Sequence, residues 1–495
     1  MSQGRKLGKL LGLVCLSLAV LSLPGGNASA ALQDSKRNVL VIVADDFGVD
    51  QLQRYVDHFG NILDAAGHRI DAPDTPNIDR LADAGVSFEN VWSSPVCSAS
   101  RAGLLTGTYS VHNSIFDVVL KDTPGMSTSM ITIAEALSAT KGYHSALFGK
   151  WHLGTNLPTD QGFEVFKGAM DAALDDYYMW EKRESVHRYD SVLHKVLVGD
   201  WTIPKPTSKS NDNYATFVNV DDASSWILDQ TGSWMAVVAF NAPHLTTTKI
   251  LDGQDPPTDG VCVGTGETMD EAVIYPAMIE CMDAYIGELL ERIHDKLSKT
   301  TIIFVGDNGT DSTMTSFQAF KGLHGKESVY EGGVAVPMII ADGNAYIGSG
   351  TGSGAGKVVS PGRWSNALVQ LVDLYDTILE IATVGGASSY NSADSYSLVP
   401  VLNQTTDVVR TYSYTEIIKN GQTQIAARNS NYKLIHQNDG SCELYNLSSD
   451  RWEEGDPLTF SKVVGPGGSV SVPYSMQQLL LGKMNTTLGL SLTCN

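Results

Sequence analysis

Four short apolar segments, each followed at once by polar residues, constrain the fold of this chain most strongly. Aliphatic and β-branched runs of this length are typical of strands that are buried on both faces. Ligands of an α/β sheet bind beyond the carboxyl ends of its strands, so four such ends predict one shared site. The segments are Asn38–Ala44 before Asp45 and Asp46, Tyr143–Phe148 before Lys150 and His152, Met235–Phe240 before His244, and Thr301–Val305 before Asp307 and Asn308.

Apolar residues at helical spacing lie between these strands. They predict helices at Asn77–Ala84, Glu271–Leu297 and Leu371–Ile381. The apolar stripe of Glu271–Leu297 is best explained as core. Ile250–Met269, rich in Gly, Pro and Asp, and Ile347–Lys357, rich in Gly and Ser, are predicted to be loops. This order of elements predicts an α/β fold.

The pattern changes to short strands near residue 408. We expect a small antiparallel sheet here, with a helix at Met476–Met484 packed on it. The expected strands are Arg410–Glu416, Gln424–Arg428, Tyr432–His436 and Glu443–Asn446.

The first 30 residues have the pattern of a secretory signal peptide. Arg5, Lys6 and Lys9 form a basic start, Leu10–Leu23 an apolar core and Ala28–Ala30 a small-residue cleavage site. A membrane anchor is the alternative, but the apolar run is short for a span. No later segment is apolar enough to cross a bilayer. We therefore expect a soluble, secreted or periplasmic protein.

Acidic residues outnumber basic ones, with 55 Asp and Glu against 34 Lys and Arg and a formal net charge of −21. The predicted signal peptide holds three basic and no acidic residues, so its removal lowers the charge to −24. Such a surface argues against binding to nucleic acid or to anionic membranes. An anionic substrate would need a local positive pocket.

The chain has six cysteines, of which five remain after the predicted cleavage. With Cys97 set apart, Cys262, Cys281, Cys442 and Cys494 can form disulfides in an exported protein. Proximity in sequence favours Cys262–Cys281 and Cys442–Cys494, and the other pairings stay open. No Cys-x-x-Cys spacing suggests zinc.

Cys97 begins the segment Cys97–Gly107, which can wind into a helix from Ser98 until Gly107 ends it. Cys97 then lies at the helix N-terminus, where backbone N–H groups favour an anion. Arg101, four residues on, projects from the same face. A reactive side chain, a guanidinium and an anion-binding helix end are therefore expected together, although an isolated cysteine is more often simply buried.

Adjacent carboxylates at the end of a buried strand are unfavourable unless a cation binds them. An isolated Asp45–Asp46 pair would usually be a solvated turn. Together with Asp307 and Asn308, however, the pair offers only hard oxygen ligands, which suit calcium or magnesium better than zinc.

Several ordered motifs resemble the sulfatase family and cover nearly the whole chain from Asn38 to about Pro457. The resemblance implies an alkaline-phosphatase-like fold, a large mixed and mostly parallel sheet flanked by helices, with a smaller C-terminal antiparallel sheet plus helix. It also implies a sulfatase that cleaves an organic sulfate ester, either a sulfated carbohydrate or an aryl sulfate. The motifs are Cys97-x-Ala99-x-Arg101 with Leu104–Gly107, Thr75–Leu81, Gly142–His152, Phe240–His244, Gly306–Gly309, Gly325–Lys326 with Tyr330–Gly333, and Glu443–Leu447.

In this family the cysteine of the first motif is oxidised after translation to formylglycine. The resemblance therefore implies that a formylglycine-generating enzyme converts Cys97. It favours calcium as the metal, held by Asp45, Asp46, Asp307 and Asn308 and by the modified Cys97. One hydroxyl of the hydrated aldehyde attacks sulfur and expels the alcohol, and the second then releases sulfate, a step that a thiolate could not perform.

The resemblance also implies roles for the basic residues. Arg101 and Lys150 fix the hydrate, and His152 assists sulfate elimination. His244 and Lys326 bind the sulfate, and His244 is the implied acid for the leaving oxygen. His324, just before Lys326, is a candidate for substrate contact, and an ordinary loop histidine is the alternative.

Three positions depart from the family pattern. Ala99 stands where proline is usual, Ala335 where arginine is frequent, and Gly168–Ala172 offers no hydroxyl where a polar residue is frequent. The last two lie where specificity is set, so the alcohol half of the substrate stays open. Two other functions are considered: a phosphodiesterase or phosphonate monoester hydrolase on the same scaffold, and a non-catalytic protein that binds sulfated glycans.

The resemblance and the change of pattern near residue 408 together give an expected domain organisation. It consists of a signal peptide at 1–30, a catalytic α/β domain at 31–405 and a C-terminal α+β subdomain at 406–495.

Overall fold

The computed structural model describes residues 37–63, 67–139, 143–190, 195–245, 253–266, 270–312, 324–350, 356–382, 392–458 and 472–494. The predicted signal peptide lies outside these residues, as do parts of the two predicted loops. Of the described residues, those of 250–269 and 347–357 contain no regular helix or strand, as expected. No helix in the described ranges is long and apolar enough to cross a membrane.

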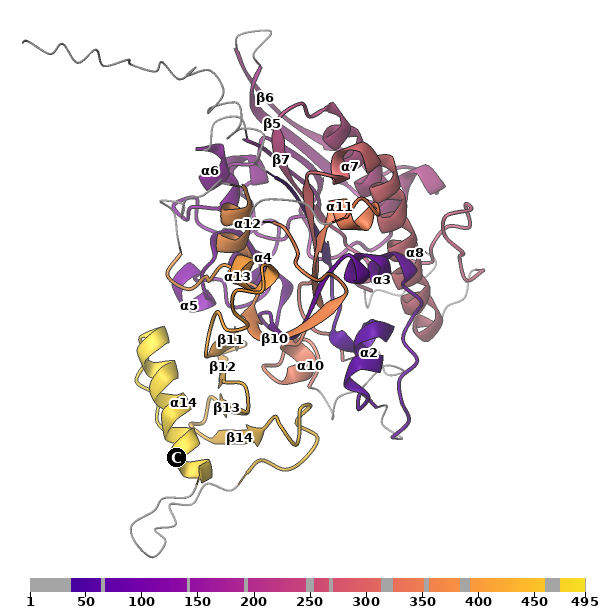
Figure 1. Cartoon of the computed structure of the whole chain (residues 1–495). Helices are drawn as coiled ribbons and strands as arrows, with labels where there is room; N and C mark the ends of the chain where they lie inside the picture. Colours follow the sequence, from indigo (N-terminus) through magenta and orange to yellow (C-terminus); the bar gives the residue numbers. More distant parts are fainter. Residues whose placement is uncertain are drawn as a thin grey trace, which may run out of the picture. The chain divides into compact units, whose positions relative to one another are not determined.

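Ten strands form one large sheet in the order β10-β2-β9-β8-β1-β7-β3-β4-β5-β6 (Figure 1). β8, β1, β7, β3 and β4 are parallel neighbours, whereas β9 and β5 run antiparallel to the strands beside them. The large mixed, mostly parallel sheet is confirmed. The strands are β1 (Asn38–Ala44), β2 (Gly85–Trp92), β3 (Tyr143–Lys150), β4 (Val165–Ala169), β5 (Lys182–Asp190), β6 (Lys195–Ile203), β7 (Ser233–Ala239), β8 (Thr300–Gly306), β9 (Met338–Asp342) and β10 (Arg363–Gln370).

Helices cover both faces of this sheet (Figure 1). α2, α3, α7 and α8 pack on one face, and α4, α6 and α12 on the other. The helices and 3-10 turns are η1 (Val49–Gln51), α2 (Gln53–Phe59), α3 (Pro76–Asp83), α4 (Cys97–Thr106), α5 (Ser110–Asn113), α6 (Ile133–Ser138), η2 (Pro158–Gln161), η3 (Asn211–Asn213), α7 (Ala215–Asp229), α8 (Glu271–Arg292), α9 (His294–Leu297), α10 (Glu331–Val334), α11 (Gly343–Tyr346), α12 (Asp373–Ala382), α13 (Val399–Leu402) and α14 (Val472–Leu488).

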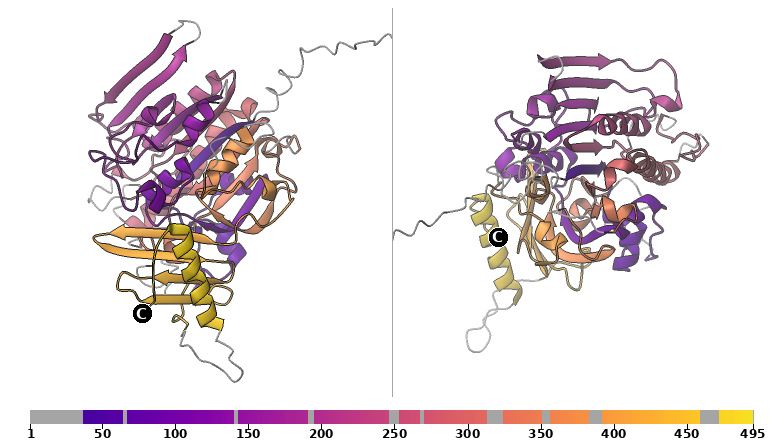
Figure 2. Two further views of the ribbon diagram at one scale, coloured as in Figure 1. Left: turned by 90° about the vertical axis from the view of Figure 1, so that its left-hand side faces the viewer. Right: turned by 45° about the horizontal axis from the view of Figure 1, so that its top comes forward.

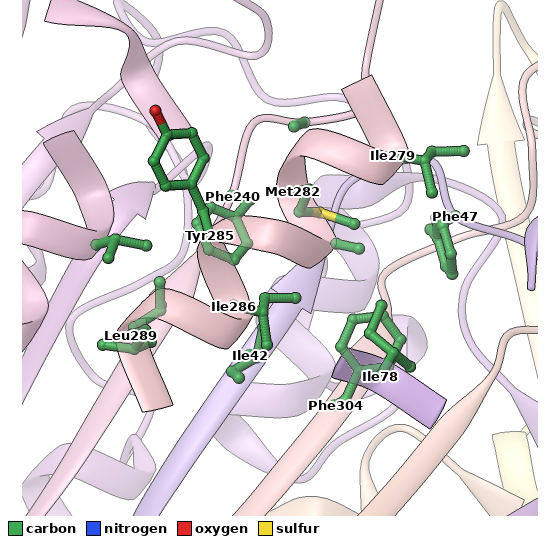
Figure 3. Close-up of a cluster of buried hydrophobic side chains, with 14 of the residues drawn as sticks. Ile42, Phe47, Ile78, Phe240, Ile279, Met282, Tyr285, Ile286, Leu289 and Phe304 are labelled. Carbon is green, nitrogen blue, oxygen red and sulfur yellow. The ribbon is translucent and has the colours of Figure 1, made fainter. Parts of the chain in front are cut away.

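The central strand β1 is buried on both faces. Leu40, Ile42 and Ala44 belong to the core beneath α8, and the alternate residues of β1 belong to the core beneath α4. Figure 3 shows Ile42 of β1 beside Ile286 of α8, and Phe304 of β8 beside Ile78 of α3. Burial of the whole strand explains its continuous apolar sequence, and it places Asp45 and Asp46 at the edge where β1 ends.

A separate antiparallel sheet follows, in the order β11-β12-β13-β14, with α14 lying across it (Figure 2). The predicted C-terminal antiparallel sheet with its helix is therefore confirmed. Glu331 of α10 links the two parts of the fold, because it forms buried ion pairs with Arg428 and Lys433 of the small sheet. The strands are β11 (Ser413–Lys419), β12 (Gln422–Arg428), β13 (Tyr432–His436) and β14 (Cys442–Asn446).

Several predicted boundaries were wrong. β11 begins at Ser413 rather than Arg410, and α14 extends over Val472–Leu488 rather than Met476–Met484. The strand expected to end at Phe148 continues to Lys150, because Gly149 and Lys150 stay in register with β4. The single helix expected at Glu271–Leu297 is divided into α8 and α9 at Ile293, whose φ of −98° and ψ of 16° leave the helical range. Ile293 is fully buried and in register with the apolar stripe, so its sequence gives no sign of the break.

Both disulfides favoured by proximity in sequence are present. Cys262 is bonded to Cys281, and Cys442 to Cys494. Cys97 is the free cysteine of the described residues, and it is buried.

Candidate active site

The four strands with polar ends are direct neighbours in the order β8-β1-β7-β3. All four are parallel, so their carboxyl ends meet at one edge of the sheet. Asp45 and Asp46 follow β1, Lys150 ends β3, His244 follows β7, and Asp307 and Asn308 follow β8. The sheet therefore brings together residues that are separated by up to 263 positions in the sequence.

Cys97 is the first residue of α4 and is 1% exposed. Gly107 ends the helix in the left-handed conformation with φ of 68° and donates its N–H to the Gly103 carbonyl. The predicted helix start and end are therefore confirmed. This helix aims its N-terminal end, with Cys97, at the edge where the strands end.

Asp45, Asp46 and Cys97 form a cluster that could hold a metal ion. One ligand atom of each lies within 4.8 Å of the other two. Asp307 joins the cluster by accepting the backbone N–H of Asp46 at 3.0 Å, and the Asn308 amide donates to Asp46 Oδ1 at 2.8 Å.

Two oxygens of this cluster are buried and accept no hydrogen bond from any described residue. They are Asp45 Oδ1 and Asn308 Oδ1. Buried oxygen atoms without a donor are unfavourable, and a cation would satisfy both. The oxygen-rich ligand set therefore fits calcium or magnesium.

Arginine and lysine side chains balance these carboxylates. Arg101 donates to Asp307 Oδ2 at 2.8 and 3.1 Å and to the Lys150 carbonyl at 3.0 Å. Lys150 Nζ lies 2.5 Å from Asp45 Oδ2, and Lys326 Nζ lies 2.6 and 2.7 Å from the two oxygens of Asp46. All three cations are nearly buried, so their charges act in a medium of low polarity.

The two predicted histidines lie beside these charges. His244 Nε2 is 3.6 Å from Asp46 Oδ2, and the side chain is 15% exposed. His152 is fully buried, and neither of its ring nitrogens has a hydrogen-bond partner among the described residues. Both imidazoles therefore keep nitrogen atoms that could bind another group in the site.

The buried charges shift the pKa values of the site. Burial raises the pKa of Asp45 to about 8, because Lys150 offsets only part of the desolvation and of the repulsion from Asp307. Burial alone would also raise the pKa of Asp46, but Lys326 and His244 hold it below its usual value. Burial lowers the pKa of His244 to about 3, although Asp46 acts in the opposite direction. Such divergent shifts are typical of functional sites.

Two residues of the site adopt the left-handed conformation, which is strained for any residue with a Cβ. They are Asp46, with φ of 59°, and His152, with φ of 57°. Hydrogen bonds hold both backbones: Tyr275 donates to the Asp46 carbonyl at 2.7 Å, and Ser98 donates to the His152 carbonyl at 2.9 Å. Backbone strain that hydrogen bonds stabilise in this way indicates a site whose geometry is set before the substrate binds.

His324 is partly buried and lies in the loop just before Lys326. Its ring stacks on Tyr330, and the Tyr330 hydroxyl donates to Glu443 of β14 at 2.8 Å. Lys326 itself is fixed by its backbone N–H, which donates to the Thr310 carbonyl at 2.9 Å. The small C-terminal sheet therefore supports the loop that carries both basic residues.

Several residues that position the site could not be recognised from the sequence. Tyr177 donates to the carbonyls of Asn241 and His244 at 2.7 and 2.9 Å, and Tyr275 holds Asp46. Each acts through its hydroxyl on a backbone carbonyl, and neither position belongs to a recognisable motif. Ser98 stands within the Cys97 motif, but its bond to His152 depends on tertiary structure.

The three departures from the family pattern lie on well-defined elements. Ala99 is buried in the first turn of α4, and Ala335 follows α10 and is 7% exposed. Gly168 and Ala169 end β4, where they pair with Gly149 and Lys150 of β3. Gly168 and Ala169 therefore lie beside the strand that carries Lys150, whereas Ala335 pairs with Trp92 of β2.

A mostly parallel sheet that gathers carboxylates, cations and imidazoles around one buried cysteine defines an α/β enzyme of the alkaline-phosphatase-like fold. The model of the sulfatase family matches residues 37–384, and the chain belongs to this family. The fold and the family that the sequence predicts are therefore confirmed.

Several proteins that are similar to this chain are sulfatases. Arylsulfatase A of Bos taurus is 27% identical over 89% of this chain and 82% of its own length. The solved structure of Ps i-CgsB in complex with κ-ι-κ-neocarrahexaose has a TM-score of 0.66 and 20% identity, covering 92% of this chain and 93% of its own. That of BT4656 in complex with D-glucosamine-2-N,6-O-disulfate has a TM-score of 0.63 and 18% identity, covering 92% and 98%.

Proposed function

We propose that this sulfatase hydrolyses the sulfate ester of a carbohydrate, with Cys97 converted to formylglycine and a calcium ion bound beside it. The proposal rests on one observation. Cys97 lies close to Asp45 and Asp46, and the cationic side chains of Lys150 and Lys326 are paired with these two carboxylates. An anionic ester can bind there despite the acidity of the chain, because the positive charge is local.

Asp45, Asp46, Asp307 and Asn308 would hold the calcium ion together with the modified Cys97. Their oxygens are the hard ligands that calcium prefers, and two of those oxygens accept no hydrogen bond from the part of the chain that the structure describes. When bound, the ion offsets the negative charge of a sulfate oxygen, and the hydrated aldehyde offers a hydroxyl nucleophile.

The surrounding side chains bind and orient the ester. Arg101, Lys150 and Lys326 offset the charge of the sulfate and of the modified residue in a water-poor site. His152 holds and moves the proton of the modified residue. The negative charge of a bound sulfate ester would raise the pKa of His244, so that it can hold the proton that it gives to the leaving alcohol oxygen. His324 contacts the organic half of the substrate.

Overall, water is added across the S–O bond of the ester. The alcohol takes one proton, and sulfate is released with the other. The strand ends, α4 and the loop that carries Lys326 hold the charged groups that this reaction needs, so little reorganisation accompanies the reaction.

A carbohydrate substrate is supported by two features. Ps i-CgsB and BT4656, which share the fold, have been solved in complex with sulfated sugars. The expected signal peptide at 1–30 would export the chain, to a secreted or periplasmic location, where polymeric sulfated carbohydrates occur. A formylglycine-generating enzyme would be the partner during maturation, and residues 31–405 and 406–495 would form the catalytic domain and the C-terminal subdomain.

The two other functions considered from the sequence receive no specific support. Family membership favours sulfate over phosphate and phosphonate esters. A protein that only binds glycans would not need the carboxylates and the two imidazoles that converge on Cys97.

The proposal is tested by expressing the chain with and without a formylglycine-generating enzyme. Peptide mass spectrometry should show the Cys97 thiol replaced by an aldehyde or its hydrate only in the first case. The rate of sulfate release from sulfated mono- and oligosaccharides should then rise in proportion to the fraction of Cys97 that is converted. A Cys97→Ala variant is the control. Fully active protein with an unmodified Cys97 would refute the proposed chemistry.

A further inference from the structure

A cavity of about 370 Å³ lies away from the active site, between α14 and the residues that lead into β11. Tyr109, three residues beyond the end of α4, forms part of its wall. Cys97 begins α4, and ten helical residues span about 15 Å. The cavity therefore lies toward the C-terminal end of this helix, whereas Cys97 lies at its N-terminal end.

Tyrosine side chains dominate the walls of this cavity. Tyr109 and Tyr414 are buried and packed edge to face, and their hydroxyls bond to Arg410 and Thr487. Tyr396 is 49% exposed and Tyr412 is half-buried. The hydroxyls of these last two bond to no residue in the described part of the chain, so both are available to a ligand. The Arg410 guanidinium lies 4.9 Å from the centre of the Tyr396 ring, so one face of that ring is covered.

The charges in the cavity leave one cation uncompensated. Arg410 is paired with Asp373, and Asp394 accepts the Tyr109 N–H at 3.0 Å and contacts His112 at 2.5 Å. Lys483 of α14 is exposed, and its ammonium lies 5.2 Å above the Tyr412 ring. No described carboxylate is within ion-pair distance of Lys483, so its charge is available to a bound anion.

We propose that this cavity binds a sugar unit that carries a sulfate group, separately from the unit that is hydrolysed. Sugar rings present C–H faces that pack on aromatic rings, and their hydroxyls pair with tyrosine hydroxyls. Lys483 supplies the cation for the sulfate. The volume is within the range of small-molecule sites. The choice of sulfate rests on the proposed function of the active site.

A second site on the same chain would act on polymeric substrates. A polysaccharide held in the cavity raises the effective concentration of its neighbouring units at Cys97. A small sulfate ester is too short to occupy both sites at once, so the cavity does not raise its effective concentration at Cys97. The cavity should therefore affect the affinity for long substrates and leave turnover of small ones unchanged.

The test measures binding of κ-carrageenan and chondroitin sulfate hexasaccharides, and of their desulfated forms, to the full chain carrying Cys97→Ala. Adding Lys483→Ala should weaken binding of at least one sulfated probe about tenfold, and Lys483→Arg should restore most of it. Tyr396→Ala should weaken binding similarly. Lys209→Ala is the matched control, because Lys209 also lies over a tyrosine ring, 5.4 Å from Tyr178, outside the cavity.

In the active protein, hydrolysis of 4-nitrocatechol sulfate should be the same with and without Lys483→Ala. Unchanged affinity of the Lys483→Ala protein, equal binding of desulfated probes, or no binding of any probe would overturn the assignment. Binding that depends on Lys483 in a protein that hydrolyses no sulfate ester would instead refute the proposed function and leave the cavity assignment standing.

Discussion

The imidazole ring of His324 lies parallel to the phenol ring of Tyr330, with ring centres 3.5 Å apart and planes inclined by 4°. Tyr330 is in turn held by Glu443, which also accepts the hydroxyl of Tyr445 at 2.8 Å. The orientation of His324 therefore depends on the small C-terminal sheet.

This stacking predicts an effect on substrate binding. His324→Ala and Tyr330→Leu should both raise KM for the sugar sulfate about tenfold with kcat nearly unchanged, because His324 contacts the substrate without taking part in the reaction. Tyr330→Phe keeps the ring and should have a smaller effect. His58→Ala is the control, since His58 stacks on Trp364 at 3.7 Å on another part of the fold. A fall in kcat alone would contradict this role.

Asp307 is predicted to be required for the metal. Asp307→Asn keeps the shape of the side chain but removes a charge that also binds Arg101, so calcium should be lost and kcat/KM should fall roughly 100-fold or more. Metal analysis of the purified protein measures the first effect. Asp342→Asn breaks a buried pair with Arg37 elsewhere, and should lower Tm while calcium is retained. An Asp307→Asn protein that keeps its activity without metal would refute the assignment.

His244 is predicted to protonate the leaving oxygen. A sugar alkoxide needs this proton, whereas a nitrophenolate leaves readily without it, and general acid catalysis contributes roughly 10²–10⁴-fold where it is needed. His244→Ala should therefore reduce kcat/KM much more for a sugar sulfate than for 4-nitrophenyl sulfate. The lost sulfate contact should affect both substrates equally. Equal losses would mean that His244 only binds sulfate, and Lys326 would become the candidate acid.

Glu416 of β11 is predicted to make stability depend on pH. Burial raises its pKa to about 7, although the Val111 N–H, at 2.7 Å, and the neighbouring His112 oppose this shift and Asp394 adds to it. The folded state thus holds a proton that the unfolded state loses near pH 4.5. The resulting stabilisation is present at low pH and is lost as pH rises through about 7.

Glu416→Gln removes this dependence. Between pH 5 and pH 9, the free energy of unfolding of the unmodified chain should fall by about 2–3 kcal/mol relative to the variant. Urea unfolding at several pH values measures the difference. A difference that stays constant over this range would show that Glu416 titrates normally.

The sequence predicted the parts of the fold whose physical signal is local. Asn38–Ala44 is apolar on both faces because both faces are buried, and Gly107 ends α4 where its left-handed conformation is needed. β5 and β6 gave no such signal. They form a hairpin at the edge of the sheet, and side chains such as Trp201, which is 54% exposed, do not alternate between core and solvent.

The residues proposed for catalysis and metal binding were predicted from the sequence, but the residues that hold them in position were not. Asp45, Lys150 and Asp307 stand at strand ends, where a pattern can reveal them. Tyr275 acts on the Asp46 carbonyl from α8, 229 positions away, so only the tertiary structure connects them. α7 could have been found, since Val220, Ala223 and Ile227 are buried at helical spacing.

The position of β1 in the sheet has a consequence for how the chain acquires its structure. β1 is completed by Ala44, but its two neighbours, β7 and β8, begin only at Ser233 and Thr300. At the usual rate of synthesis, roughly 5–20 residues per second, β8 is synthesised roughly 15–50 s after β1. During that interval Cys97 has no closed core around it, so the nascent chain offers to another enzyme a thiol that the finished fold conceals.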